Sequence, residues 1–303
     1  INMRSIAAFE KSINPDDWNE LMRLFLVRRT RTFIKENYAK TDGTNGRKYL
    51  QFPDGTKSYF PDRIPCAIKF KTEEGDQFSR LYSSEMIELI ESLNLPRYGL
   101  INYYDESKAT GITKQEQLII DNLSKAGKRM MGFCKSTFFK RIVSSGFAFL
   151  LTVYRHILRN AVFIYAIDNK LPLPIGDENS LPEEYIEDED TNETLFGNED
   201  KTDVISERGQ EIIFPTDMKV YMAKAKEYYD IISHKNNLSW INHKYFKRTL
   251  KRQSNKDCGI LIGMLKLCGN WNADKDQKLI ALHDLLEQKH SKDKVLVFTQ
   301  YSD

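Results

Sequence analysis

The sequence lacks the loop with which ATP-hydrolysing proteins hold nucleotide phosphates. Such a loop reads G-x-x-x-x-G-K-[ST], because its backbone N–H groups cradle the phosphates and its lysine reaches the γ-phosphate. The Gly127-Lys128 pair does not fit, since Asn122 stands where the first glycine is required and Arg129 follows the lysine. The chain by itself is therefore expected to hold no nucleotide and to contain no catalytic residue.

Metal-binding and nucleophilic patterns are also missing. The acidic pairs Asp177-Glu178 and Asp188-Glu189 lie in a long acidic run, where such pairs arise by chance, and the five histidines do not cluster. There is no H-E-x-x-H sequence of a metalloprotease and no serine-hydrolase elbow. We therefore expect no metal and no cofactor in this chain.

Cysteines are few, and no long apolar run is present. The four cysteines form no C-x-x-C pair, and none has a histidine at ligand spacing: Cys66, Cys134, Cys258 and Cys268. This excludes the usual zinc sites and is typical of reduced, buried thiols in a cytosolic protein. The longest apolar run, 146–153, is shorter than the roughly 18–20 residues that span a bilayer, and no signal peptide is recognisable. We expect a soluble cytoplasmic protein without membrane contact.

Charge is distributed unevenly along the chain. Residues 177–203 hold twelve carboxylates against one lysine, a local charge of −11, whereas the formal net charge is only +2, so that the rest of the chain carries +13. A basic body suggests a polyanionic partner, although many basic proteins bind none. The acidic run has few apolar residues and is expected to form a solvated or disordered insertion.

Hydrophobic periodicity predicts a mainly helical chain with two β elements. The expected helical segments are 12–38, 78–90, 113–131, 136–168, 216–232, 240–250, 257–267 and 276–290. Around the Asp54-Gly55 turn, residues 47–70 are expected to form a small antiparallel hairpin, with 66–70 as a third strand. Residues 295–298 are apolar on both faces, as in a parallel strand covered by helices, and would open an α/β domain.

Three stretches carry charged or polar groups in a distinctive setting. The first, 135–160, is apolar with basic ends. It predicts either a core helix whose arginines snorkel or pair with carboxylates, or a brace that presents Lys140 and Arg141 to a phosphate backbone. The second, 24–31, places Arg28 and Arg29 beside a third arginine. It could bind phosphates or carboxylates, or form a solvated helix face.

The third stretch comprises Asp276-Gln277-Lys278-Leu279, a helix, and residues 294–303. Thr299 and Gln300 follow the strand predicted over 295–298. Polar groups at the C-terminal end of a parallel strand sit where α/β folds place ligands, although they could also simply cap the strand.

These stretches, in this order and spacing, resemble blocks of the Swi/Snf-type superfamily 2 helicase-like ATPases, most closely the bacterial HepA/RapA-like branch. Residues 26–31 resemble the L-R-R-T block, and residues 139–149 resemble the F-K-R-L-E-S-S-x-x-A-F block, with Val143 in place of its glutamate. Asp276-x-Lys278-Leu279 with residues 294–300 resembles the entry to the second RecA-like lobe and helicase motif IV.

The resemblance implies that the chain is the central fragment of an ATP-dependent DNA translocase, an α/β motor fragment that is predominantly α-helical here. The implied parts are the end of the first RecA-like lobe at 1–40, a β-hairpin with helical protrusion at 41–175, an acidic insertion at 176–204, a second helical region at 205–275 and the start of the second lobe at 276–303. The implied nucleic-acid contacts are Lys140, Arg141, Thr299, Gln300, Arg28 and Arg29.

In the parent protein, ATP and Mg²⁺ would bind between the two lobes. The phosphate loop would precede Ile1, and the arginine finger would follow Asp303. The implied partners are double-stranded DNA and other proteins, such as RNA polymerase or components of a defence system. The fragment alone would be inactive. The alternative from another functional class is a non-enzymatic helical adaptor that binds nucleic acid or protein.

Overall fold

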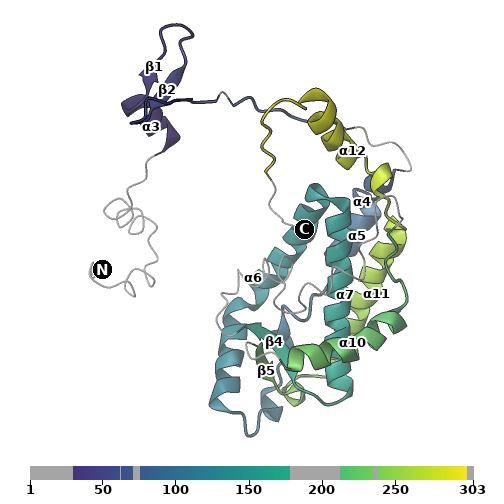
Figure 1. Ribbon diagram of the computed structural model, residues 1–303. Helices are drawn as coiled ribbons and strands as arrows, with labels where there is room; N and C mark the ends of the chain where they lie inside the picture. The colour runs from purple at the N-terminus through teal and green to yellow at the C-terminus, as the bar shows by residue number, and fades with distance from the viewer. Residues whose placement is uncertain (1–29, 62, 71–75, 178–211, 235–237, 299–303) are drawn as a thin grey trace, which may run out of the picture. The chain divides into compact units, whose positions relative to one another are not determined.

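The computed structural model describes residues 30–61, 63–70, 76–177, 212–234 and 238–298. The chain divides into two compact units, Ile1–Ala67 and Ile68–Asp303, and each is described by itself (Figure 1). Most of the helix predicted over 12–38 lies outside the described residues. So does all of the acidic run except Asp177.

The described part of the first unit, residues 30–61 and 63–67, contains a three-stranded antiparallel sheet and one short helix. Its elements are α3 (Arg31–Asn37), β1 (Lys40–Thr41), β2 (Lys48–Gln51) and β3 (Lys57–Tyr59), with strand order β1-β2-β3. The hairpin predicted around Asp54-Gly55 is confirmed as β2–β3. Gly55 has φ +85, a value that glycine adopts without steric strain.

The predicted third strand at 66–70 is wrong. These residues belong to no strand, and all but Phe70 are exposed. The third strand is β1, which pairs with β2 across a short turn containing Gly46 at φ +68. A turn of a few residues brings β1 back to β2 at a smaller entropic cost than a connection from the far side of the hairpin would require.

Where the structure describes it, the second unit is a helical assembly with one two-stranded ladder. Its elements are α4 (Gln77–Leu81), α5 (Ser84–Ser92), α6 (Lys114–Ser144), α7 (Gly146–Asp168), β4 (Leu173–Asp177), α10 (Met218–Ser233), β5 (Leu238–Ile241), α11 (Thr249–Cys268) and α12 (Gln277–Asp284). A π-helical turn, Leu285–Lys289, extends α12, and β4 pairs with β5 antiparallel. The prediction of a mainly helical chain is therefore confirmed for the described residues.

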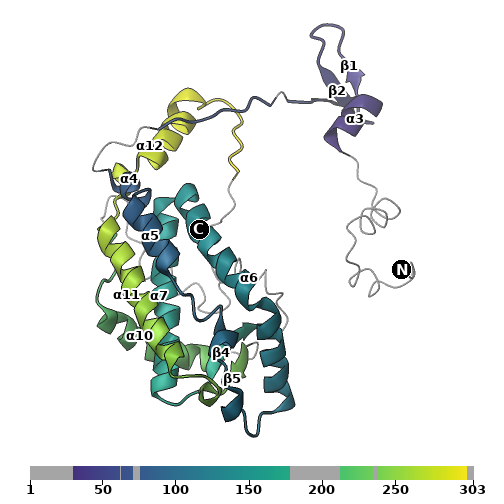
Figure 2. The same cartoon turned by 180° about the vertical axis from the view of Figure 1, so that it is seen from behind.

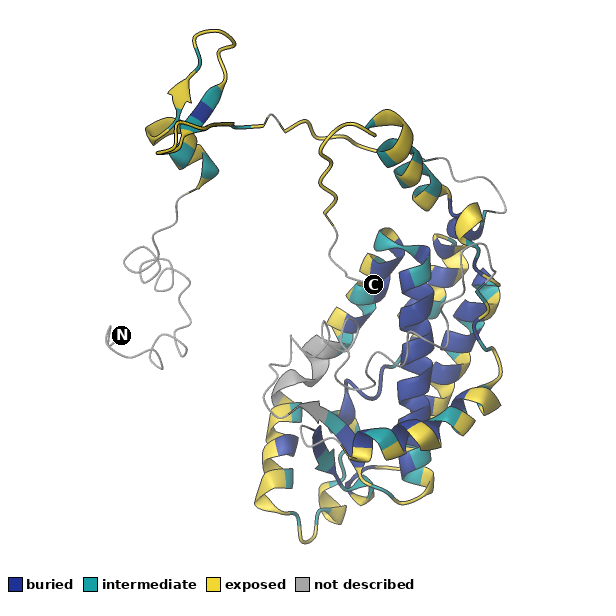
Figure 3. Cartoon of the chain, viewed as in Figure 1, coloured by how far each residue is buried: buried dark blue, intermediate teal, exposed yellow. Residues whose placement is uncertain are grey.

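Helix α7 occupies the centre of this unit. Nineteen of its 23 residues are buried, and α6, α10 and α11 pack around it (Figures 1 and 3). A helix that is apolar on all sides must be covered on all sides. Among the described helices, α7 alone is long and apolar enough to cross a membrane, which the search for apolar runs missed, but its apolar window is almost wholly buried by protein.

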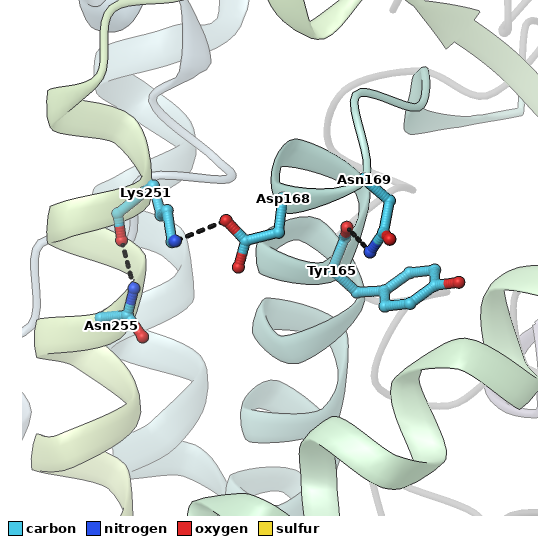
Figure 4. A network of polar contacts seen from close by, with 5 residues as sticks. All are labelled: Tyr165, Asp168, Asn169, Lys251 and Asn255. Carbon is cyan, nitrogen blue, oxygen red and sulfur yellow. Dashed lines mark hydrogen bonds and ion pairs between the residues drawn. The ribbon is translucent and has the colours of Figure 1, made fainter.

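Polar contacts fix the C-terminal end of α7. Lys251 of α11 forms an ion pair with Asp168, and Asn169 donates from Nδ2 to the Tyr165 carbonyl at 2.9 Å (Figure 4). Both charged side chains are about two-fifths exposed, so the pair contributes at most about 1 kcal/mol. Figure 2 shows α7 and α11 side by side from behind.

A buried carboxylate supports the turn after α5. Asp257 of α11 is fully buried and accepts hydrogen bonds from the backbone N–H groups of Asn94 at 3.0 Å and Leu95 at 2.7 Å. Leu95 has φ 49, a conformation that costs free energy in a branched residue. Two backbone donors to one carboxylate offset that cost and join α5 to α11.

Three predicted helices differ from the structure. The helix predicted over 136–168 is broken at Ser145, whose backbone is extended at φ −155 and whose hydroxyl caps α7 by accepting from Ala148 N. Serine favours this capping position over a helix interior. The helix predicted over 240–250 is wrong at its start, because Trp240 belongs to β5, and the one predicted over 257–267 is part of the longer α11.

The predicted strand at 295–298 is not formed within the described chain. These residues belong to no sheet, and their side chains are exposed, up to 87% for Phe298. A parallel strand gains its hydrogen bonds and its cover from neighbouring strands and helices. The described residues contain neither a parallel strand nor a RecA-like lobe.

Replacing Gly146 with alanine should destabilise the protein. A Cβ at Gly146 would lie 2.0 Å from the buried indole of Trp271, which has no space to move away. We expect the free energy of unfolding to fall by about 1–3 kcal/mol, measured by urea denaturation.

The matched control is Gly259→Ala in α11, where a Cβ meets nothing within 4 Å. Alanine should raise stability there by about 0.5–1 kcal/mol, since it loses less conformational entropy than glycine. Equal effects of the two substitutions would contradict the packing of Trp271 on Gly146.

Candidate functional site

Four of the six predicted nucleic-acid contacts lie outside the described residues: Arg28, Arg29, Thr299 and Gln300. The other two are neighbours near the end of α6 and face different surroundings. Lys140 is exposed, whereas Arg141 is completely buried, with 0% of its surface accessible. Arg141 could meet a phosphate backbone only if α6 moved, so its burial favours the core-helix interpretation, and of these two residues only Lys140 is exposed to solvent.

The structure joins two of the three distinctive stretches. The Lys278 ammonium, from α12, donates to the carbonyls of Val143 and Ser144, the latter at 2.6 Å. These carbonyls belong to the last turn of α6, where the helix supplies no further N–H group to donate to them. The residues lie more than 130 positions apart in the sequence. A cation also interacts favourably with the negative end of a helix dipole.

The same turn is closed from the other side by Trp271. Its indole lies directly against Gly146, the first residue of α7, and its backbone exchanges two hydrogen bonds with Ile212, at 2.8 and 2.9 Å. Gln77 of α4 forms reciprocal hydrogen bonds with the backbone of the next residue, Asn272. We call Val143, Ser144, Gly146, Trp271, Asp276 and Lys278 the junction.

Asp276 orders the segment that carries the lysine. Its carboxylate caps α12 by accepting from the backbone N–H groups of Lys278 and Leu279, both at 3.0 Å. Asp276 is only 5% exposed, and burial raises the pKa of its carboxyl group. Burial also lowers the pKa of the Lys278 ammonium. Both shifts show that removing the Asp276 carboxylate and the Lys278 ammonium from water costs free energy.

Neither a cluster of metal-ligating side chains nor a cysteine activated as a nucleophile is found among the buried groups of the described residues. They contain no group of three or more histidine, cysteine or acidic side chains close enough to hold an ion. Burial raises the pKa values of the Cys258 and Cys268 thiols to about 12, so neither is a nucleophile near neutral pH. Cys134 is also buried, as expected, but Cys66 is exposed.

Sequence reasoning found part of the junction. Asp276 and Lys278 belong to a block that resembles the family. The contact of Lys278 with the end of α6, however, joins residues too distant in the sequence for any local pattern to predict. Trp271 was missed entirely. The available signal was Gly146, a glycine inside an apolar helical pattern, which often marks a close approach by another group.

Comparison with protein-family models, with curated proteins and with solved structures finds no match.

Replacing Lys278 with methionine should loosen the junction. Methionine keeps the apolar stem but leaves the Val143 and Ser144 carbonyls without their charged donor. We expect the free energy of unfolding to fall by about 1 kcal/mol, measured by urea denaturation.

Lys275→Met is the control. Lys275 lies three residues before Lys278, is exposed and carries the same charge, and its substitution should change stability by less than about 0.5 kcal/mol. If the two variants were equally stable, the hydrogen bonds from Lys278 to the Val143 and Ser144 carbonyls would contribute nothing measurable to stability.

Proposed function

We propose that this chain is the central part of an ATP-dependent DNA translocase of the Swi/Snf-type superfamily 2, in which it couples two RecA-like lobes. The junction carries the proposal. Two blocks that resemble this family separately, residues 139–149 and 276–279, meet through Lys278 and the end of α6. Such a contact is what a motor would need if the segment leading to its second lobe had to move with the helical body.

The role of each part follows from this arrangement. Helix α7 would act as a rigid axis, since it is buried along most of its length. The junction would tie that axis to α12, and α12 would lead to the strand at 295–298. The exposed apolar side chains of this segment, such as Leu296 at 75%, suit a strand that pairs with a sheet outside the described residues.

ATP and Mg²⁺ do not fit the residues of this chain. The sequence has no phosphate-binding loop, and the described residues have no acidic cluster for a metal. In the proposal both belong to the parent protein, whose neighbouring parts would bind them. Duplex DNA is the proposed partner, other proteins such as RNA polymerase or defence components could join it, and the cytoplasm is the proposed location.

The coding sequence that flanks this chain tests the proposal against the adaptor alternative. A G-x-x-x-x-G-K-[ST] loop within a few hundred residues upstream, in the same reading frame, is the expected result. A start codon near residue 1 with no such loop would favour the adaptor.

The two basic residues of the 139–149 block should behave differently in DNA binding. We expect Lys140→Ala to lower the slope of log affinity against log salt concentration by about 1, because an exposed lysine neutralises one phosphate. Arg141→Met should leave that slope unchanged and lower stability by about 1–3 kcal/mol, because Arg141 is buried.

Fluorescence anisotropy with a labelled duplex and urea denaturation, made on one preparation, measure both effects. Lys219→Ala, an exposed lysine of α10, is the control and should change neither. A reduced slope for Arg141→Met would show that the Arg141 side chain leaves its buried position and contacts a phosphate when the protein binds DNA.

A further inference from the structure

The small sheet of the first unit has two chemically different faces. Its register places Lys40 opposite Tyr49, Tyr49 opposite Tyr59, and Gln51 opposite Lys57. Because side chains alternate along a strand, these five residues share one face. Helix α3 contacts the other face, where Lys48 Nζ donates to its Lys35 carbonyl at 3.2 Å.

Two tyrosines form the floor of the first face. The rings of Tyr49 and Tyr59 lie 5.4 Å apart, centroid to centroid. The Lys57 ammonium lies 4.7 Å from the centre of the Tyr49 ring, and the Arg47 guanidinium lies 5.7 Å from that of Tyr59. These distances are in the range of cation–π attraction, which holds a charged side chain over an aromatic ring.

A third cation completes the arrangement. Lys40 Nζ donates to Gln51 Oε1 at 2.8 Å across the sheet. The side chains of Lys40, Arg47 and Lys57 are all exposed, although each is held by a partner in the sheet. We call Lys40, Arg47, Tyr49, Lys57 and Tyr59 the tyrosine face.

Among the described residues of the unit, no carboxylate lies within ion-pair distance of these cations. None of the three forms an ion pair with a residue in the described part of the chain. The nearest acidic partner of the face, Asp42, accepts hydrogen bonds from the Thr44 hydroxyl and the Tyr59 hydroxyl. These hydrogen bonds, with a smaller contribution from the charge of Lys57, hold the pKa of Asp42 well below its usual range, so it stays a carboxylate.

We propose that the tyrosine face binds the phosphate backbone of duplex DNA. Three exposed cations without ion pairs, positioned on one face, are complementary to a row of phosphates, and pre-positioning lowers the entropy that binding must cost. Contacts to phosphates position a protein without reading sequence. The choice of DNA over an acidic protein rests on the proposed function. None of the blocks that carry the family resemblance includes these residues.

The test compares two triple variants of the 303-residue chain. Lys40→Ala/Arg47→Ala/Lys57→Ala removes the cations of the tyrosine face. Lys114→Ala/Lys219→Ala/Lys256→Ala removes the same charge from exposed positions on three helices of the other unit. Binding to a labelled duplex of about 20 base pairs is measured by anisotropy between about 50 and 200 mM salt.

We expect the first variant to lower the salt slope by about 2–3 and the control to leave it unchanged. Lys40→Arg/Lys57→Arg keeps the charge and should keep the slope. If the triple variant fails to fold, as judged by circular dichroism, Lys40→Gln alone is measured. Lys40 is exposed and its substitution should lower the slope by about 1.

The outcomes separate this inference from the proposed function. If the unmodified chain does not bind duplex DNA, both are overturned. If it binds and the two triple variants behave alike, the tyrosine face is not a DNA site, but the proposed function stands. If the first variant loses binding to a poly-glutamate peptide while its DNA slope is unchanged, the face takes an acidic protein instead, which also overturns the inference.

Discussion

The burial of α7 is the constraint on which the helical unit depends. Its side chains are apolar on nearly every side, and full burial of each large one stabilises the fold by about 1.5–3 kcal/mol. No single neighbour can cover such a helix, so α6, α10 and α11 must surround it. Its few polar residues are placed accordingly. His156, for example, is buried against the rings of Tyr98 and Phe138.

That arrangement makes the start of α7 a critical point. The chain must turn sharply between α6 and α7, and the turn leaves the last carbonyls of α6 to be satisfied in a partly buried place. Lys278 supplies the donor and Trp271 fills the space over Gly146. Both come from the segment after α11. The segment after α11 is therefore held in place by its contacts with the end of α6 and the start of α7. These contacts are the physical basis for proposing that the segment transmits motion.

Local patterns predicted the elements that depend on local physics. The period of apolar residues located most helices, and Asp54-Gly55 located the hairpin, because both signals lie within a few residues. The break between α6 and α7 was not predicted, because the apolar pattern continues on both sides of Ser145 and one serine does not by itself indicate the end of a helix. After α7, Pro174 pairs with Trp240 in a two-stranded ladder, beside a register shift where proline is tolerated. The Lys278 contact depends on tertiary structure alone.

The central claim is that the end of α6 and the start of α12 behave as one mechanical unit. Hydrogen–deuterium exchange of Lys278→Met tests this most directly, because it reports local opening segment by segment. If the claim holds, amides in 141–149 and in 277–284 will both exchange several-fold faster than in the unmodified chain, while those of α10 stay unchanged. Faster exchange in 277–284 alone would show that Lys278 orders only its own helix and would contradict the coupling.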